Sequence, residues 1–240
     1  MAHVIETMQV AGSPMEVFLF APAGAGPHPG IVLCQHIPLG HTGLENDPVT
    51  LATAERYAQN GYTVAVPFIF HWWAKPDDIQ LKRDGFRDDW TELDLKAAFD
   101  LLARQRGVDA QRIGIVGHCW GGRVAWLGAA TDPRYAACAI FYGGRVKAAM
   151  GPGTPPAIEL ASKIRCPVIG FFGNDDTSPS PADVDEYERA LTAAGVKVEF
   201  HRYDDAGHAF QSFNNPERYR PQASEDAWSK ALGFLYKNLR

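Results

Sequence analysis

A cysteine flanked by glycines is the feature of this chain that most strongly indicates chemistry. The segment GIVGHCWGG, residues 114–122, passes from an apolar strand through a tight turn into a helix, and Cys119 lies at the turn. Glycines two positions before and after the cysteine let the strand and the helix approach closely, which is the layout of a nucleophile elbow. The helix N-terminus favours a thiolate and offers the free amide of Trp120 to an oxyanion. We therefore expect Cys119 to be a nucleophile rather than a buried cysteine in a structural turn.

An acid and a histidine follow in the chain order that such a nucleophile requires. Asp175 and Asp176 come directly after an apolar strand at residues 167–173, and His208 follows a strand at residues 196–203. The histidine can take the thiol proton, and a carboxylate can orient the imidazole and stabilise its cation. Position alone leaves Asp175 open as the acid, and we favour Asp176.

The elements that must position these groups alternate between short apolar strands and helices. This pattern predicts an α/β fold with a mainly parallel sheet and helices on both faces. A hairpin at residues 3–10 and 15–21 predicts an antiparallel N-terminal edge. Further strands are expected at residues 30–35, 62–67, 112–117, 136–142, 167–173 and 196–203. Helices are expected at residues 50–60, 88–106, 121–130, 181–194 and 223–239, and loops at residues 68–87 and 143–156.

Composition and charge limit the class of protein. The chain has 240 residues, of which 46% are hydrophobic and 21% charged, as is typical of one α/β domain spanning residues 1–240. The net charge is -5 and the basic residues are scattered, so nothing indicates a nucleic-acid partner. No apolar run approaches the roughly 20 residues that cross a bilayer. We expect a cytoplasmic protein that acts on a small molecule, with no membrane partner, cofactor or metal, and the oligomeric state stays open.

The other three cysteines, Cys34, Cys138 and Cys166, are widely separated and lie in or beside apolar runs. The chain has no CxxC pair that would suggest a zinc site or a redox dithiol. We expect these cysteines to be reduced and buried. Cys119 should then be the accessible thiol.

Over nearly its whole length the chain resembles the dienelactone hydrolase family of α/β hydrolases. GHCWGG resembles the G-x-C-x-G-G elbow of that family, GNDD resembles its G-x-x-D acid turn, and AGHAF resembles its histidine loop. The resemblance implies an α/β-hydrolase fold and selects Asp176 as the acid. It also implies cleavage of a carboxylic ester or lactone through a thioester acyl-enzyme, with the backbone amides of Trp120 and Ile37 binding the oxyanion.

Two positions depart from the pattern of the family. His36 stands where dienelactone hydrolases carry a glutamate that holds the resting thiol, so its side chain either replaces that contact or only its backbone contributes. Ser212 stands where the family has one of the arginines that bind a substrate carboxylate. The other arginine would be Arg83 or Arg87, and sequence does not decide between them.

The aromatic residues of the expected loop at residues 68–87 bear on the substrate. Trp72 and Trp73 are difficult to bury, and we expect them to border the substrate. With one cationic partner at most, a buried substrate carboxylate would be costly. The sequence therefore predicts a preference for neutral esters and uncharged lactones.

Other functions are compatible with the same residues. His36, His41 and Glu45 follow a strand and could hold a metal ion for metal-dependent hydrolysis. The triad could instead cleave phosphotriesters or transfer an acyl group to an acceptor other than water. A binding module that keeps the fold without the chemistry is a further alternative.

Overall fold

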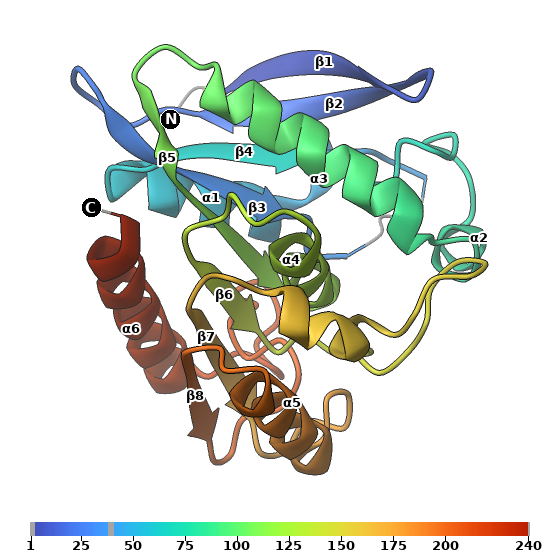
Figure 1. Cartoon of the computed structure of the whole chain (residues 1–240), viewed down its shortest axis with the longest axis vertical. Coiled ribbons are helices and arrows are strands. Elements are labelled where there is room, and N and C mark those ends of the chain that lie inside the picture. Colours follow the sequence, from blue (N-terminus) through green and yellow to red (C-terminus); the bar gives the residue numbers. More distant parts are fainter. Residues whose placement is uncertain (1–2, 38–40, 240) are drawn as a thin grey trace.

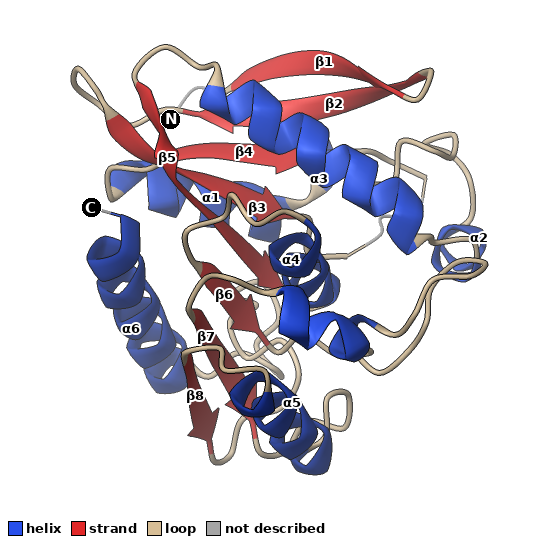
Figure 2. Cartoon of the chain, viewed as in Figure 1, coloured by secondary structure: helices blue, strands red, loops and turns tan. Residues whose placement is uncertain are grey.

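The computed structural model describes residues 3–37 and 41–239, and these residues form one eight-stranded sheet covered by helices (Figures 1 and 2). The strand order is β1-β2-β4-β3-β5-β6-β7-β8. β2 alone runs in the direction opposite to the other strands, since it pairs antiparallel with both β1 and β4. The strands are β1 Val4–Val10, β2 Ser13–Phe20, β3 His28–Cys34, β4 Thr63–Pro67, β5 Val108–His118, β6 Cys138–Phe141, β7 Val168–Gly173 and β8 Val198–Tyr203. The predicted mainly parallel sheet with an antiparallel N-terminal edge is confirmed.

Helices cover both faces of the sheet, as predicted. They are α1 Pro48–Gln59, α2 Ile79–Asp84, α3 Asp88–Ala103, α4 Trp120–Thr131, α5 Pro181–Ala193 and α6 Pro221–Leu239, with short 3-10 helices η1 Leu44–Asn46 and η2 Ala157–Lys163. Figure 1 shows α3, α4 and α5 in front of the sheet, while α1 and α6 pack on the opposite side. The six-residue helix α2 lies inside the segment expected to be a loop. It is too short to show a helical repeat in the sequence, and a side-chain cap from Asp78 to the amide of Gln80 supports its start.

The central strands are buried on both faces, which explains why they read as continuous apolar runs. Every residue of β4, β6 and β7 is buried. Parallel pairing aligns the carboxyl ends of β5, β6, β7 and β8 along one edge, with His118 opposite Phe141 and Gly173 opposite Tyr203. Three segments that carry candidate chemistry leave the sheet at this edge.

Two boundaries differ from the expected ones by three residues or more, and the others by one or two at most. α3 ends at Ala103, three residues early, and β5 begins at Val108, four residues early. The turn between them uses Gly107 at a φ of 87°, and Val108 then pairs with His28 at the start of β3. The sequence gives weak signals here because residues 108–112 mix apolar with polar side chains and all are at least partly exposed.

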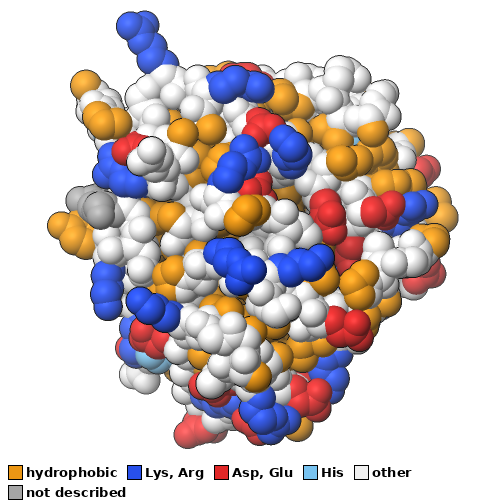
Figure 3. All heavy atoms as spheres, in the orientation of Figure 1, with side chains coloured by type: hydrophobic (Ala, Val, Ile, Leu, Met, Phe, Trp, Pro, Cys, Tyr) orange, Lys and Arg blue, Asp and Glu red, His pale blue; other side chains and the backbone are white. Residues whose placement is uncertain are grey.

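The described surface carries no large patch of one charge on the face shown in Figure 3. Acidic and basic side chains are interspersed on the face drawn in Figure 3. None of the described helices is both long and apolar enough to span a membrane.

Candidate active site

Cys119 lies between β5 and α4 in a backbone conformation that is strained for a residue with a side chain. Its φ is 57° and its ψ is −119°. A Cβ atom on Gly117 would clash with the carbonyl of Gly121, and one on Gly121 would clash with the carbonyl of Cys34. The turn therefore requires glycine at both positions, as the elbow layout predicts, and it holds the thiol above the carboxyl edge of the sheet.

The structure brings the three chemical side chains together in one hydrogen-bonded chain. Nε2 of His208 lies 2.9 Å from Sγ of Cys119, and Nδ1 of His208 lies 2.8 Å from Oδ2 of Asp176. The second carboxylate oxygen of Asp176 accepts a 2.8 Å hydrogen bond from the amide of Ser178. Asp176 is 4% exposed, whereas Asp175 is exposed to solvent. Asp176 is thus the aspartate that contacts the histidine.

The imidazole of His208 is held in its charged form by its two partners. Burial opposes the charge, but the hydrogen bonds with Asp176 and Cys119 outweigh burial and raise the pKa of His208 to about 10. Both neighbours can carry negative charge, which favours the cation between them. The geometry matches an imidazolium that shares a proton with the sulfur atom.

The remaining cysteines are buried and do not reach this site. Burial raises the pKa of Cys166 to about 12, and it raises the pKa values of Cys34 and Cys138 well above the ordinary range of a thiol. Cys119 is partly exposed, and no disulfide joins any of the four. Cys119 is therefore the accessible thiol.

The backbone amide of Trp120 is not free, in contrast to the sequence-based expectation. It donates a 3.1 Å hydrogen bond to the carbonyl oxygen of His36. A trans peptide is planar, and its C=O and N–H point in opposite directions. The N–H of Ile37, which belongs to the same peptide, therefore points away from Trp120. The two amides that the resemblance implies for an oxyanion do not converge in this structure.

The side chain of His36 lies near His208, and no hydrogen bond joins it to the thiol of Cys119 in the described structure. Within the described part of the chain, its Nδ1 atom is buried and has no hydrogen-bond partner. Burial lowers the pKa of His36, and the nearby charges of His208 and Arg218 lower it further, while Asp47 opposes the shift. His36 is thus a neutral imidazole, and Sγ of Cys119 contacts His208 instead.

Two cavities share Cys119 and His208. The smaller one, of about 190 Å³, is also lined by Trp120, Gly144, Arg145, Thr177 and Ser178. The larger one, of about 540 Å³, is also lined by His36, Ile37, Arg83, Ser212 and Arg218. A substrate held at the thiol can therefore extend into two separate spaces.

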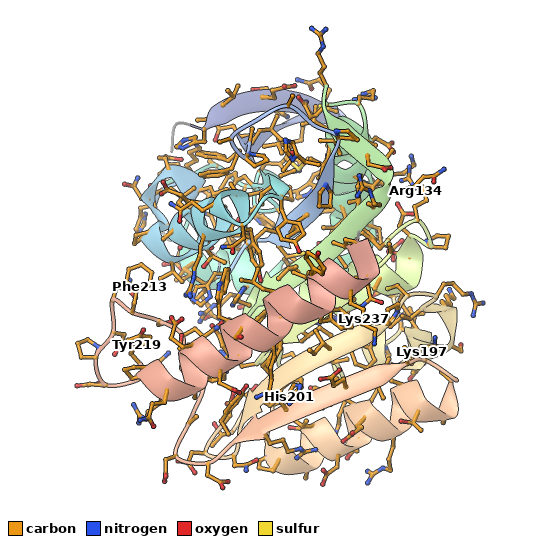
Figure 4. All side chains as sticks on the ribbon, turned by 90° about the vertical axis from the view of Figure 1, so that its left-hand side faces the viewer. Arg134, Lys197, His201, Phe213, Tyr219 and Lys237 are labelled. Carbon is orange, nitrogen blue, oxygen red and sulfur yellow. The ribbon has the colours of Figure 1, made fainter. Side chains whose placement is uncertain are left out.

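Arginines line both cavities, whereas the sequence suggested one cationic partner at most. Arg83 lies in the larger cavity, and its Nε has no hydrogen-bond partner among the described residues. Arg87 instead pairs with Asp89 at 2.6 Å and lines neither cavity. Arg218 reaches the larger cavity from the loop that joins β8 to α6, the loop on which Figure 4 labels Phe213 and Tyr219. Ser212 is buried there.

Trp72 and Trp73 do not border either cavity, which corrects the sequence-based interpretation. The indole N–H of Trp72 donates to Oδ2 of Asp94 at 3.0 Å, and its ring stacks on Trp90 at 4.8 Å. Trp73 packs against Trp90 as well. A buried carboxylate satisfies the polar atom of the indole, so these side chains anchor their loop on α3.

The residues proposed for a metal site do not converge. Nδ1 of His41 lies 2.6 Å from the carbonyl oxygen of Pro76, and Glu45 pairs with Lys75 at 3.3 Å. Across residues 3–37 and 41–239, no three His, Cys, Asp or Glu side chains are grouped to hold a metal ion. This geometry gives no support to metal-dependent hydrolysis.

A buried ion pair whose arginine, Arg123, also lines the smaller cavity was missed from the sequence. Nη1 and Nη2 of Arg123 lie 2.5 and 2.9 Å from the two carboxylate oxygens of Asp88. Arg123 also donates to the carbonyl oxygens of Arg145 and Ala148, which ties α4 to the loop after β6. Arg123 at the start of the apolar run RVAWLGAA could have indicated this pair, because a guanidinium buried with such a helix needs a charged or polar partner.

Comparison with known proteins yields one family. Residues 15–239 match the model of the dienelactone hydrolase family. A protein of Rhodococcus opacus named carboxymethylenebutenolidase is 29% identical over 245 residues, covering 99% of this chain and 93% of that protein. A "Putative carboxymethylenebutenolidase" of Methylorubrum extorquens is 30% identical over 221 residues, covering 87% of this chain and 72% of that protein.

Solved structures agree with the fold. A "Putative Dienelactone Hydrolase" from Klebsiella pneumoniae superposes with a TM-score of 0.83 at 26% identity, covering 99% of this chain and all of that one. A dienelactone hydrolase-like promiscuous phosphotriesterase from metagenomic libraries superposes with a TM-score of 0.81 at 17% identity, covering 100% of this chain and 99% of that one.

Proposed function

Since the chain belongs to the dienelactone hydrolase family, and is therefore a hydrolase acting on an ester or lactone, we propose that it cleaves this bond through Cys119 and a thioester acyl-enzyme. The observation that carries the proposal is the hydrogen-bonded chain from Cys119 through His208 to Asp176. A nucleophile, a base and an orienting acid in contact are what covalent acyl transfer requires.

Acylation uses the sulfur atom and the proton on His208. The Cys119 thiolate attacks the carbonyl carbon, a C–S bond forms, and the carbonyl oxygen becomes an oxyanion. Collapse of this intermediate breaks the C–O bond, and Nε2 of His208 gives its proton to the leaving alkoxide. A thioester on Cys119 and a free alcohol result; for a lactone, the alcohol stays on the acyl chain.

Deacylation returns the enzyme to its starting state. Neutral Nε2 of His208 takes a proton from water, and the hydroxide formed attacks the thioester carbon. The C–S bond breaks, the carboxylic acid leaves, and the proton on His208 again pairs with the Cys119 thiolate. Asp176 holds the ring in the tautomer that presents Nε2 and stabilises the cation in both steps.

The oxyanion is bound, in this proposal, by the amides of Trp120 and Ile37. Backbone N–H groups aimed at developing charge contribute strongly to such reactions. Because the carbonyl of His36 now occupies the Trp120 amide, the peptide between His36 and Ile37 must rotate before both amides can serve.

Substrate binding is assigned to the two cavities. In the larger cavity, Arg83 supplies a cation with an unpaired Nε, and His36, whose pKa is lowered by burial, lines the same cavity. A carboxylate on the substrate can be paired here without a large desolvation penalty. A preference for neutral substrates is therefore no longer expected, and of the two arginines that the sequence left open, Arg83 rather than Arg87 is the proposed carboxylate partner.

Two related activities use the same triad and differ in their products. The similarity to a protein named as a promiscuous phosphotriesterase makes phosphotriester cleavage the second candidate. Its test is release of more than one 4-nitrophenol per chain from paraoxon, with loss of this release in Cys119→Ala; a single equivalent and a stable adduct on Cys119 would mean inhibition rather than cleavage. Acyl transfer would instead show as ester or amide products when an alcohol or amine competes with water.

The proposed function is tested by turnover of 4-nitrophenyl acetate and of an uncharged aryl lactone. We expect hydrolysis of both by the natural chain, unchanged by EDTA, and loss of activity in Cys119→Ala. Cys166→Ala, which removes a thiol outside both cavities, is the matched control. Full activity of Cys119→Ala, or activity lost with EDTA and restored by zinc, would contradict the proposal.

A further inference from the structure

Arg145 lies in the wall of the smaller cavity and has no role in the mechanism described above. It belongs to the loop between β6 and η2, and its side chain lines the cavity beside Cys119 and His208. The guanidinium lies over the indole of Trp120, with its central carbon 5.8 Å from the ring centroid. Because Trp120 directly follows the nucleophile, this cation–π contact keeps the positive charge near the reacting sulfur.

The backbone of Arg145 is fixed by the buried ion pair beneath it. Its carbonyl oxygen accepts a 3.1 Å hydrogen bond from Nε of Arg123, which is bound at both Nη atoms by Asp88. The side chains of Arg123 and Asp88 are 1% and 2% exposed. Arg145 has a φ of 58°, a conformation that costs energy for a residue with a side chain and needs such support. The base of the Arg145 side chain is therefore held in place relative to Cys119.

The charge of Arg145 is not neutralised within the described part of the chain. Arginines elsewhere pair with carboxylates, among them Arg56, Arg87, Arg134 and Arg202. The carboxylate that shares the smaller cavity is Asp176, and both of its oxygens are engaged by His208 and Ser178. An exposed guanidinium that is fixed at its base and lacks a carboxylate partner can bind an incoming carboxylate with two parallel hydrogen bonds.

We propose that Arg145 is a specificity-determining residue that binds a carboxylate on the part of the substrate held in the smaller cavity. The proposal rests on the ester or lactone hydrolysis proposed above and specifies its substrate class. Arg83 and Arg218 line the larger cavity, which opens on the same nucleophile. The acyl part and the leaving group of an ester thus meet different arginines, and a carboxylate on either part is recognised separately.

Two matched pairs of esters distinguish the two parts. 4-Acetoxybenzoate carries its carboxylate on the leaving group, and methyl 4-acetoxybenzoate is its neutral match. Monophenyl adipate carries its carboxylate on the acyl part, and phenyl methyl adipate is its neutral match. Release of the phenol gives kcat/KM for each ester, and the ratio of acid to methyl ester measures recognition of the charge.

We expect Arg145→Gln to lower this ratio by about 10- to 100-fold in one of the two pairs, the range for losing a hydrogen bond to a charged group. Arg145→Lys should keep part of the preference, because the charge remains and the two-pronged geometry does not. The matched control is Arg202→Gln, because Arg202 lies on β8 and pairs with Asp185 on α5. This variant should leave both ratios unchanged. No change in either ratio with Arg145→Gln, or an equal fall for acids and methyl esters, would overturn the proposal.

Binding without turnover separates this proposal from the proposed function. Calorimetry with Cys119→Ala measures the affinity for each acid, and the same titration with Cys119→Ala/Arg145→Gln shows the contribution of the arginine. A loss of affinity for one acid in the double variant supports the anion site. If the natural chain nevertheless hydrolyses neither ester, that failure contradicts the proposed function and leaves the anion site supported. Equal affinities with and without Arg145 would contradict its assignment.

Discussion

The carbonyl oxygen of His36 lies 3.1 Å from the amide nitrogen of Trp120 and accepts its hydrogen bond. Side chains hold the peptides on both sides of this carbonyl. The amide of His36 donates to Oγ1 of Thr50 at 3.2 Å, and the carbonyl of Ile37 accepts from Nε2 of Gln35 at 2.9 Å. The single peptide between His36 and Ile37 can therefore rotate while its neighbours stay in place. In its present orientation it presents a carbonyl, which repels an oxyanion.

We predict that a tetrahedral adduct on Cys119 rotates this peptide, so that the N–H of Ile37 takes the place of the His36 carbonyl. The physical reason is that the adduct oxygen carries negative charge and needs donors. Crystal structures of the free protein and of its adduct with an aryl trifluoromethyl ketone provide the measurement. The idea fails if the adduct forms while the His36 carbonyl stays within hydrogen-bond distance of the Trp120 amide.

The acid of the triad is tested by changing two adjacent aspartates. Asp176→Asn should lower kcat on the order of 10² to 10⁴-fold, because it removes the group that orients and charges His208. Asp175→Asn is the matched control, since Asp175 is exposed, and a change of about twofold or less is expected. Comparable losses in both variants, or a larger loss in Asp175→Asn, would contradict the assignment.

The pH dependence of Asp176→Asn gives a separate readout. Burial lowers the pKa of His208, but the hydrogen bonds with Asp176 and Cys119 raise it to about 10. Because the imidazolium must protonate the leaving group, kcat/KM should fall as pH rises through this pKa. Removing the Asp176 carboxylate should move this upper limb to lower pH. An upper limb at the same pH in both proteins would show that Asp176 does not stabilise the cation.

Stability should depend on the ion pair between Asp88 and Arg123. Asp88→Asn leaves a buried guanidinium without its counter-ion, and we expect the free energy of unfolding to fall by about 3–5 kcal/mol. Urea denaturation measures this value. Asp89→Asn is a suitable control, because its partner Arg87 is partly exposed and surface pairs contribute little. A loss below about 1 kcal/mol in Asp88→Asn would mean that the pair is dispensable.

His118 should make the protein sensitive to acid. Burial, with a contribution from His36, lowers the pKa of His118 to about 3, although the polar side chain of Gln211 opposes the shift. In the unfolded chain a histidine has a pKa of about 6.5, so the unfolded state binds a proton at a higher pH than the folded state does. The free energy of unfolding should therefore decrease as pH falls from about 6.5 to about 3. His118→Phe can keep the stack on Phe141 without a titrating group. Its free energy of unfolding should therefore decline less between pH 7 and pH 4 than that of the natural chain, and parallel declines would contradict this.

Much of the fold and the elbow could be predicted because their signals are local. Buried parallel strands are continuous apolar runs, and Gly117 is required by a close contact with Gly121 in the same segment, although Gly121 is required by a contact with Cys34 on β3. The choice between Asp175 and Asp176 depends on which side chain is buried against His208, and the sequence needed the family resemblance to make it.

The walls of the site could not be predicted because they depend on how loops turn. Trp72 was expected beside the substrate, but its indole N–H binds Asp94 on α3, and an aromatic pattern does not identify such a partner. Arg145 and Arg218 reach the cavities from long loops, one of them through a residue at positive φ. The orientation of the peptide after His36 is likewise a tertiary property, since it depends on a hydrogen bond to a residue 84 positions later in the chain.

The central claim, that Cys119 carries the acyl group, is tested most directly by trapping the intermediate. The protein is mixed with 4-nitrophenyl pivalate, whose bulky acyl group slows deacylation, quenched in acid within one turnover and analysed by intact and peptide mass spectrometry. We predict one added pivaloyl group per chain, located on Cys119, removed by hydroxylamine at neutral pH as expected for a thioester, and missing in Cys119→Ala. An acyl group on any other residue, or hydrolysis of the ester by Cys119→Ala at the natural rate, would contradict the account.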